Sequence, residues 1–382
     1  MSAILPSPPS GGSRLAIIGD IHGWYGAHDP AALTALQADI TCIVGDIGEE
    51  NLDLVTLISE LPVPKAVILG NHDGWQHAKS NLGKEFRDRS MPQAPTKEEI
   101  REFYKGVVNQ LDVLGRDHVG FGAKHFPAQR LSVVGARPCS WGGERWKLGA
   151  GVSADLYGVR DMAESAARIQ HHICSQPAGT TVVVMGHNGP TGLGQLRHNI
   201  CGVDWQDSQG DNGDPDLRRA LDGARQRGVT VPLVIFGHMH HQLSRRRGRP
   251  QALRNMAHVD SETGTVCLNA AVVPRWRQIG TSLQNHFTVA DLEDGVVTFA
   301  AHVWVEIAKK GGSAMHAAPA SVDRARESCC KKVLSCLLRA TSVKQLLEEI
   351  QAEAPPEVTV DGVIQQPTRV PAIVKHAEFR RE

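Results

Sequence analysis

The chain of 382 residues lacks a charge excess and lacks any long apolar run. Lysine plus arginine equals aspartate plus glutamate at 41 each, which removes any general electrostatic reason to expect nucleic acid or an anionic membrane as partner. No apolar stretch approaches the roughly 20 residues that a membrane-spanning helix needs. We therefore expect neither a nucleic-acid-binding protein nor a membrane protein.

The cysteines lack the spacing of a redox or zinc motif. Eight cysteines include no Cys-x-x-Cys pair, and Cys42 and Cys267 lie inside apparent strands. This pattern is typical of reduced, packed thiols, so we expect a soluble intracellular protein of the cytoplasm, with a plastid as the alternative. Cys329, Cys330 and Cys336 cluster near the C-terminus, where helix packing and a regulatory or metal role are both open.

The beginning of the chain lacks the apolar core of a signal peptide. Proline, serine and glycine dominate the stretch MSAILPSPPSGGSR, so we expect residues 1–13 to form a disordered leader. The absence of acidic residues leaves a short transit peptide as the other interpretation. Three catalytic signatures are missing from the whole chain: Gly-x-Ser-x-Gly, the Walker loop and the dinucleotide fingerprint.

Short apolar runs alternate with helix-like stretches after the leader. The runs at 14–20, 39–46 and 65–71 are rich in Ile and Val, and helices are predicted between them at 29–37 and 51–61. This alternation predicts βαβ units and a parallel sheet. Both faces of such a sheet are covered, which explains why the runs are continuously apolar.

The pattern changes in the charged segment 76–129, which we interpret as an insertion that shapes substrate access. Its clearest element is a predicted amphipathic helix at 96–114. The elements predicted after it are strands at 130–136, 180–188, 231–240 and 265–271, helices at 153–175 and 214–227, and a hairpin at 286–305 that turns near 293–295. We expect one domain over 14–305, followed over 306–382 by a linker, a helix at 321–350 and a tail.

Polar side chains follow five of the predicted strands where each strand ends. They are Asp20, His22, Asp46, Asn71, His72, Asp73, His187, His238 and His240. In open α/β sheets, ligands bind beyond the carboxyl ends of the strands. Burying so many polar groups together is costly unless something compensates them. Imidazole and carboxylate ligands suit a divalent Mn, Fe, Zn or Co ion.

These strand ends resemble the five ordered motifs of the calcineurin-like metallophosphoesterases. The matching stretches are GDIHG at 19–23, GD at 45–46, GNHD at 70–73, GH at 186–187 and GHMH at 237–240. The resemblance covers about 14–305 and implies an α/β fold, a two-sheet β-sandwich flanked by helices. The wording around GDIGEENLDLV and KAVILGNHDGW also resembles a subgroup found in photosynthetic organisms.

The resemblance implies a role for each motif residue and a centre of two divalent ions, Mn, Fe or Zn. Asp20, His22 and His240 would hold one ion. Asn71, His187 and His238 would hold the other, with Asp46 bridging both. A hydroxide bridging the ions would then attack a phosphomonoester or phosphodiester, and protonated His72 would act as acid at the leaving oxygen. Asp73 would fix the local loop through backbone hydrogen bonds.

The chain departs from the phosphoprotein phosphatases of this family. Glu49 stands where their carboxylate partner of the catalytic histidine lies, although an acid complementing the dipole of the following helix is its other interpretation. Glu50 and Asn51 replace the Arg-Gly of that branch, so the usual phosphate-binding arginine is missing and we exclude a Ser/Thr protein phosphatase. Arg137 is a candidate replacement for substrate binding, or else a structural loop arginine.

Several other readings are open at this stage. The main rival to an enzyme is a non-catalytic metal-containing scaffold that binds protein partners, and a nucleotide hydrolase is a variant of the enzyme. Trp75 and Trp141 would either stack on an aromatic leaving group or pack in the core. The basic run 245–249 would draw acidic substrates or form a solvated hairpin, and His171 with His172 is expected on a helix surface.

Overall fold

The computed structural model describes residues 8–9, 11–26, 29–75, 95–144, 146, 150–206, 210–244, 251–279 and 282–309, with the pairs 339–340, 359–360 and 379–380. Most of the predicted leader lies outside the described residues, as do the segment 76–94, the basic run 245–249, and Cys329, Cys330 and Cys336. The predicted helix at 321–350 is also undescribed, except for two residues that are not helical. Arg339–Ala340 form strand β13, which pairs with the hairpin strand β12.

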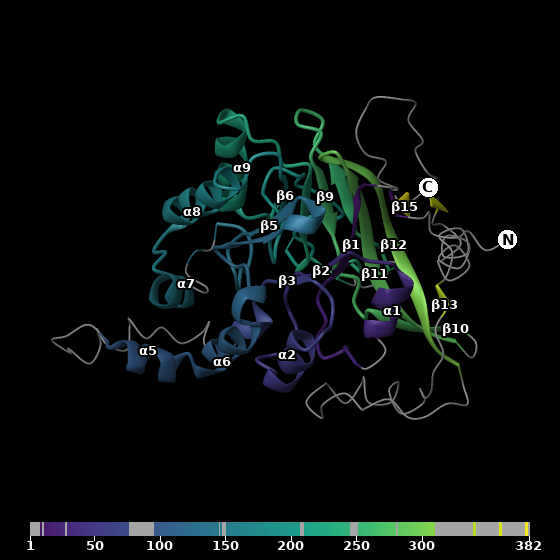
Figure 1. Ribbon diagram of the computed structural model, residues 1–382, viewed down its shortest axis with the longest axis horizontal. Coiled ribbons are helices and arrows are strands. Elements are labelled where there is room, and N and C mark those ends of the chain that lie inside the picture. Colours follow the sequence, from purple (N-terminus) through teal and green to yellow (C-terminus); the bar gives the residue numbers. More distant parts are fainter. Residues whose placement is uncertain are drawn as a thin grey trace.

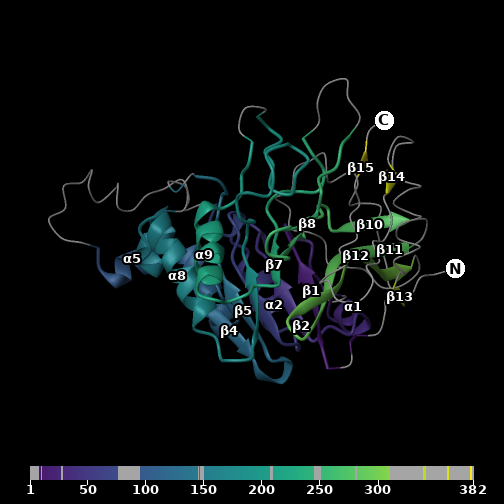
Figure 2. The ribbon, with the colours of Figure 1, turned by 90° about the horizontal axis from the view of Figure 1, so that it is seen from above.

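Two sheets pack face to face with helices outside (Figures 1 and 2). The first sheet has the order β13-β12-β11-β1-β2-β3, with β10 beside β11. Its strands are β1 (Ser13–Ile18), β2 (Ile40–Ile43), β3 (Lys65–Val67), β10 (Trp276–Ile279), β11 (Ser282–Glu293), β12 (Val296–Lys309) and β13 (Arg339–Ala340). Strands β1, β2 and β3 are parallel, as the βαβ pattern predicts.

The second sheet has the order β4-β5-β6-β7-β9-β8. Its strands are β4 (Ala123–Phe126), β5 (Leu131–Gly135), β6 (Thr181–Met185), β7 (Leu233–Phe236), β8 (Ala257–Val259) and β9 (Val266–Asn269). The inner strands β5, β6, β7 and β9 run parallel. A separate pair is formed by β14 (Thr359–Val360) and β15 (Phe379–Arg380).

The helices divide between the outer faces of the two sheets. They are α1 (Asp29–Ala35), α2 (Leu52–Ser59), α5 (Lys97–Phe103), α6 (Lys105–Leu114), α7 (Ala150–Tyr157), α8 (Met162–Cys174) and α9 (Pro215–Gln226), with the 3-10 turns η1 (His72–Gly74), η2 (Gly115–Asp117) and η3 (Pro127–Gln129). Among the described residues, no helix combines the length and hydropathy that crossing a bilayer requires.

Strand β1 shows why the predicted strands are apolar throughout. Leu15 and Ile17 face the core between the two sheets, while Ala16 and Ile18 face the core under the helices of the first sheet. Each fully buried Leu or Ile contributes roughly 1.5–3 kcal/mol of transfer free energy. Helices α8 and α9 cover the second sheet in the same way, through Ile169 and Leu217 among others. The predicted α-β-β-α sandwich is confirmed.

Two predicted helices are wrong in their continuity. The helix predicted at 96–114 breaks at Tyr104, whose backbone leaves the helical region and whose buried hydroxyl donates to Asp155 Oδ2 at 2.9 Å. The helix predicted at 153–175 breaks at Gly158, which has a φ of 66°. A new helix then begins where Asp161 Oδ1 accepts from two backbone N–H groups, each at 2.8 Å.

The described part of the segment 76–129 is built into the sandwich. Helix α6 packs Val107 and Val108 into the core that also holds Leu54 and Val55 of α2. Strand β4 pairs with β5 at the edge of the second sheet. This part of the segment therefore completes both the outer helical layer and a sheet edge.

Candidate metal centre

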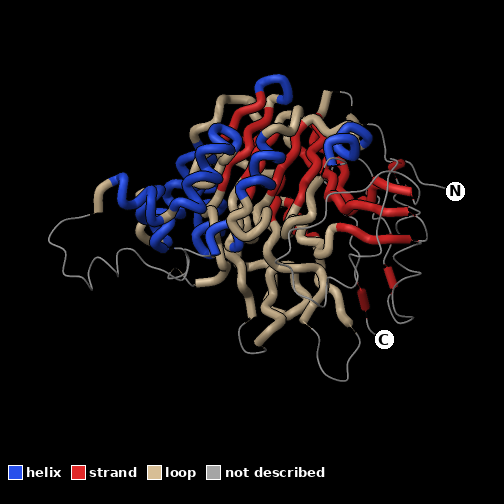
Figure 3. Tube along the Cα trace, turned by 90° about the horizontal axis from the view of Figure 1, so that it is seen from below, coloured by secondary structure: helices blue, strands red, loops and turns tan. Residues whose placement is uncertain are grey.

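The nine polar residues of the motifs lie at the carboxyl ends of five strands, where Figure 3 shows loops gathered beyond one end of the sheets. Strands β1, β2 and β3 of the first sheet are followed by Asp20, His22, Asp46, Asn71, His72 and Asp73. Strands β6 and β7 of the second sheet are followed by His187, His238 and His240. The two sheets thus contribute to one site.

One half of the site gathers around Asp20. His240 Nε2 lies 3.2 Å from Asp20 Oδ2, and His22 Nε2 lies 3.3 Å from His240 Nε2. Burial lowers the pKa of His22 to about 3, so its ring is neutral and offers a lone pair. Burial alone would raise the pKa of Asp20, but the interactions with His240, His187 and His22 together outweigh it and hold that pKa below its usual range.

The other half gathers around Asn71. Its Oδ1 lies 2.8 Å from His187 Nε2 and 2.9 Å from His238 Nδ1. His187 Nδ1 lies 2.8 Å from the carbonyl oxygen of Val44, which can only accept, so this nitrogen carries the proton. A ring that carries its one proton on Nδ1 would turn the Nε2 lone pair toward the Asn71 oxygen. A cation between these two atoms satisfies both.

Asp46 lies between the two halves. Its Oδ2 is 3.8 Å from His22 Nε2, and its Oδ1 is 3.3 Å from His187 Nε2. Burial, followed by the charge of Asp20, raises the pKa of Asp46 to about 7. The charge of Asp20 thus disfavours ionisation of Asp46, and a divalent cation would relieve this repulsion.

The donor set fits two metal ions. Three groups offer ligand atoms within 4.8 Å of one another: Asp20 with His22 and His240, His22 with Asp46 and His72, and Asp46 with His187 and His238. Two of the three groups share Asp46. Asp20 Oδ2 is inaccessible to solvent and makes no hydrogen bond of normal geometry among the described residues, with His240 Nε2 as its neighbour at 3.2 Å, so it has room for a cation as a further partner.

Several residues of the site have backbone conformations that residues other than glycine rarely adopt. Asp20, His22, Asp46 and His238 have φ values of 45°, 45°, 51° and 67°. Strained residues of this kind cluster at functional sites because the surrounding fold holds them there. Gly70 is needed for close approach, since a Cβ at this position would lie 2.3 Å from the backbone nitrogen of Asp46.

His72 lies at the edge of the cluster and is tied to it through its backbone. Its N–H donates to Asp46 Oδ1 at 2.8 Å, and its ring meets the ring of His22 edge-on at 4.9 Å. Glu49 Oε1 lies 3.8 Å from His72 Nδ1, but the Glu49 side chain is 66% exposed. Glu49 therefore lies beside His72 in a loose, solvent-screened contact.

The predicted role of Asp73 in fixing the loop is confirmed. Its Oδ1 accepts from the N–H groups of Ile47 and Gly48 at 2.8 and 3.1 Å, and its Oδ2 accepts from Gly70 at 2.8 Å. Asp73 thereby ties the loop after β2 to the loop after β3. It positions Asp46 and Asn71 through the backbone, while burial and the charge of Asp46 raise its own pKa to about 7.

The sequence left two interpretations of Arg137 open, substrate binding and a structural loop arginine. The structure favours the second. It is only 3% exposed, and its guanidinium lies 2.7 Å from Asp214 Oδ1 and 3.1 Å from Asp216 Oδ2. These two carboxylates raise its pKa, although burial alone would lower it. Since these carboxylates compensate its charge inside the fold, Arg137 is not part of the proposed site.

Two residues that support the site carry no sequence motif. Arg254 is 2% exposed and donates through Nε to the carbonyl oxygen of His240 at 3.0 Å. Gln110 of helix α6 is buried and donates through Nε2 to the carbonyl oxygen of Asp73 at 2.8 Å. Both act on backbone carbonyls far away in the chain, so no local pattern could have revealed them.

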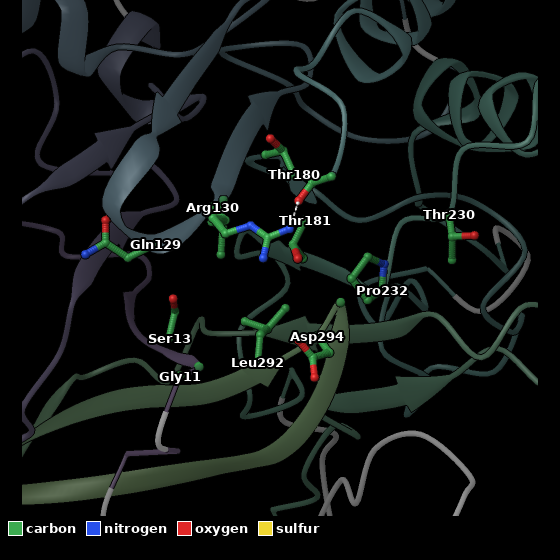
Figure 4. A pocket seen from close by; sticks show the side chains of 14 residues that line it. Gly11, Ser13, Gln129, Arg130, Thr180, Thr181, Thr230, Pro232, Leu292 and Asp294 are labelled. Carbon is green, nitrogen blue, oxygen red and sulfur yellow. Dashed lines mark hydrogen bonds between the residues drawn. The ribbon is translucent and has the colours of Figure 1, made fainter.

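A cavity of about 440 Å³ lies at the opposite, amino ends of the parallel strands (Figure 4). Its lining includes Arg130, Thr181 and, across the opening, Asp294 of the hairpin turn. Arg130 donates to the carbonyl oxygen of Gly179 at 3.2 Å. None of the metal-centre residues lines this cavity, so the two features are separate.

Comparison with known proteins gives one family and several structural neighbours. The model of the calcineurin-like phosphoesterase family matches residues 13–242. The comparison with curated proteins finds no match.

Three solved structures illustrate the structural similarity. A dimetal phosphatase from Danio rerio has 12% identity and a TM-score of 0.39, covering 76% of this chain and 95% of its own. A putative 5'-nucleotidase from Staphylococcus aureus has 12% identity and a TM-score of 0.40, with coverage of 76% and 54%. A purple acid phosphatase from yellow lupin (Lupinus luteus) seeds has 12% identity and a TM-score of 0.33, with coverage of 90% and 56%.

Proposed function

Because the chain belongs to the calcineurin-like phosphoesterase family, and is therefore a metal-dependent hydrolase of phosphoric esters, we propose that it acts through a dinuclear centre at the carboxyl ends of the strands. The convergence of seven ligand side chains from both sheets carries this proposal. These residues are Asp20, His22, Asp46, Asn71, His187, His238 and His240.

Each half of the centre would hold one divalent ion, Mn, Fe or Zn. Asp20, His22 and His240 would form the first set, Asn71, His187 and His238 the second, and Asp46 would join them. When bound, the two ions supply positive charge for the phosphate and acidify water to a nucleophile at neutral pH. The Val44 carbonyl holds the His187 tautomer, and Arg254 holds the backbone of His240, so both rings face the centre before anything binds.

His72 is our candidate for the general acid. Its ring lies at the edge of the cluster, in contact with His22, and its side chain is 28% exposed. It therefore borders both the candidate ligands and the solvent, from which an ester would arrive. Protonated His72 would stabilise charge on the leaving oxygen or donate its proton. Glu49, 3.8 Å away, is the carboxylate that we propose as its orienting partner.

The proposed catalytic domain extends over 14–305, beyond the family match. The long strands β11 and β12 follow that match, and β11 pairs with β1 in the middle of the first sheet. The segment 76–129 would shape substrate access, since its helix α6 reaches the site loop through Gln110. Whether the substrate is a monoester or a diester is the question that the first assay answers.

The test is hydrolysis of p-nitrophenyl phosphate and bis-p-nitrophenyl phosphate with added Mn, Fe or Zn, alongside analysis of bound metal. We expect close to two ions per chain and turnover of at least one ester. His72→Ala should keep its metals and lose roughly 10²–10⁴-fold in rate, the usual contribution of a general acid. Full metal binding without cleavage of either ester by any metal form would instead favour the non-catalytic scaffold.

A further inference from the structure

Three aromatic rings form a continuous stack at the edge of the metal centre. The rings of His72 and Trp75 lie 4.7 Å apart at 16°, and the rings of Trp75 and Trp141 lie 4.8 Å apart at 29°. One end of the stack is therefore the candidate acid. From the sequence, Trp75 and Trp141 had two interpretations: stacking on an aromatic leaving group, or packing in the core. The structure shows that Trp75 stacks on His72, which neither interpretation included.

We propose that Trp75 and Trp141 are positioning residues for His72, and that their stack fixes the plane of its imidazole. This inference rests on the proposed function, because it assigns a task to residues beside the proposed acid. A general acid must be held within a few tenths of an ångström and 10–20° of its working geometry. The question is which contacts supply that restraint.

The backbone of His72 is already restrained by its own turn. His72 begins the 3-10 turn η1, and its N–H donates to Asp46 Oδ1. The next residue, Asp73, accepts three backbone N–H groups, and its carbonyl accepts from Gln110. What remains free is rotation of the side chain about χ1 and χ2.

The side-chain contacts of His72 differ in quality. Glu49 is two-thirds exposed and 3.8 Å from Nδ1, which is too long for a hydrogen bond. The contact with His22 is edge-on, so it restrains the position of the ring more than its plane. Trp75 alone of these three lies nearly parallel to the imidazole, and stacking of this kind contributes about 0.5–1.5 kcal/mol beyond burial.

Trp141 gives the stack a rigid base on the other sheet. It lies in the loop after β5, where the Gly143 N–H donates to the carbonyl oxygen of Asn212 at 2.7 Å and the Ser140 hydroxyl donates to Asp214 Oδ1 at 2.7 Å. Arg137 holds that same Asp214 carboxylate. The buried ion pair thus anchors the loop that carries Trp141, and through Trp75 it restrains His72.

The kinetic test compares an ester with a good leaving group, p-nitrophenyl phosphate, and one with a poor leaving group, phenyl phosphate. A displaced acid matters most for the poor leaving group, whereas a general loss of structure lowers both rates alike. We expect Trp75→Ala to lower kcat for phenyl phosphate by about tenfold or more and kcat for p-nitrophenyl phosphate by less than about threefold. Trp75→Phe should recover most of the loss, because it restores a stacking ring.

Two comparisons complete the kinetic test. In the His72→Ala background, Trp75→Ala should cost almost nothing further, since its effect acts through His72. Trp304→Ala removes a tryptophan that contacts His286 at 5.2 Å outside the centre, so it should leave the ratio of the two rates unchanged. An equal loss on both esters, or an undiminished loss in the His72→Ala background, overturns the inference.

A second readout does not depend on activity. With histidine-labelled full-length protein, the ring protons of His72 are identified by their absence in His72→Ala. We expect their NMR resonances to be shifted upfield by the Trp75 ring current, and to move downfield and broaden in Trp75→Ala. Unmoved resonances overturn the inference. If they move as expected but the wild type cleaves no ester, the contact stands and the proposed function fails.

Discussion

Asp73 and Asp46 are both buried carboxylates of the site, and burial together with a neighbouring carboxylate raises the pKa of each to about 7, yet their hydrogen-bond partners differ. Asp73 accepts three backbone N–H groups, whereas Asp46 accepts one, from His72, and faces histidines and the charge of Asp20. A carboxylate that accepts several backbone N–H groups can hold a loop in place. A carboxylate surrounded by histidine nitrogens and another carboxylate is better suited to bind a cation. This contrast separates a supporting residue from a candidate ligand although both come from Gly-rich strand ends.

Asp73→Asn should destabilise the protein by about 2–4 kcal/mol, because an amide leaves one of the buried N–H groups facing its NH₂. Urea unfolding followed by circular dichroism measures this loss. Asp112→Asn is the matched control, since Asp112 is exposed and pairs with exposed Arg101. It should change stability by less than about 1 kcal/mol. A stable Asp73→Asn would mean that the carboxylate does not hold the two loops together.

Asp46→Asn should have opposite effects with and without metal. The pKa of Asp46 is raised to about 7, so in chelator-treated protein its contribution to stability is complete below about pH 3.8 and is lost as the pH rises through 7. The variant lacks this loss and should gain about 2–4 kcal/mol over the wild type at pH 8. With metal added, the variant should bind fewer ions and lose activity.

Denaturant unfolding from pH 4 to pH 8, in chelator and in Mn, measures both effects. If the stabilities of the two chelator-treated proteins run parallel across this range, Asp46 is not a repelled carboxylate and its bridging assignment loses its main support.

At the scale of elements, the buried cluster of Arg137, Asp214 and Asp216 joins the end of β5 to the start of helix α9. Arg137→Met should destabilise the protein by about 3–5 kcal/mol, because it leaves two buried carboxylates without their counter-charge. It should change KM for the cleaved ester by less than about threefold, since Asp214 and Asp216 already compensate the charge of Arg137. Thermal unfolding and steady-state kinetics test the two parts, and a large rise in KM would restore its substrate-binding interpretation.

The parallel core and the hairpin could be predicted from the sequence because their signals are local. Buried parallel strands require continuous apolar runs, and the hairpin turn at Asp294 and Gly295 has the positive φ at both residues that Asp-Gly favours. The helix breaks at Tyr104 and Gly158 were missed. Gly158 is a local signal for the end of a helix, and Asp161 is a local signal for the start of one, so this break could have been predicted. The break at Tyr104 could not, because it follows from a buried contact with Asp155 that only the fold creates.

The candidate site divides in the same way. Its ligand types lie beside glycines at strand ends, so Asp20, Asp46 and His187 could be found from the sequence alone. The supports could not, because Arg254 and Gln110 bind backbone carbonyls across long sequence separations. Arg137 illustrates the reverse problem. Its place at a strand end suggested a ligand-binding cation, and its two buried partners lie more than 70 residues away.

At the scale of the whole molecule, both of the packed sheets contribute candidate metal ligands to one site. Asp20, Asp46 and Asn71 follow strands of the first sheet, while His187 and His238 follow strands of the second. Metal ions bound here would cross-link the two sheets, and unfolding would require their release. Metal binding should therefore stabilise the entire sandwich.

Removal of metal by a chelator should lower the melting temperature, and adding Mn or Zn back should restore it. A ligand at about 1,000 times its Kd adds about 4 kcal/mol to the free energy of unfolding, which corresponds to a shift on the order of 10 °C for a domain of this size. His187→Ala should lose most of this shift, because His187 links the second sheet to Asn71 and Asp46. His171→Ala is the matched control, since His171 is exposed on α8, and it should keep the full shift. Calorimetry of all three proteins with and without metal decides the matter: an equal metal-dependent shift in His187→Ala would show that His187 does not bind the ions, and its assignment as a ligand would have to be abandoned.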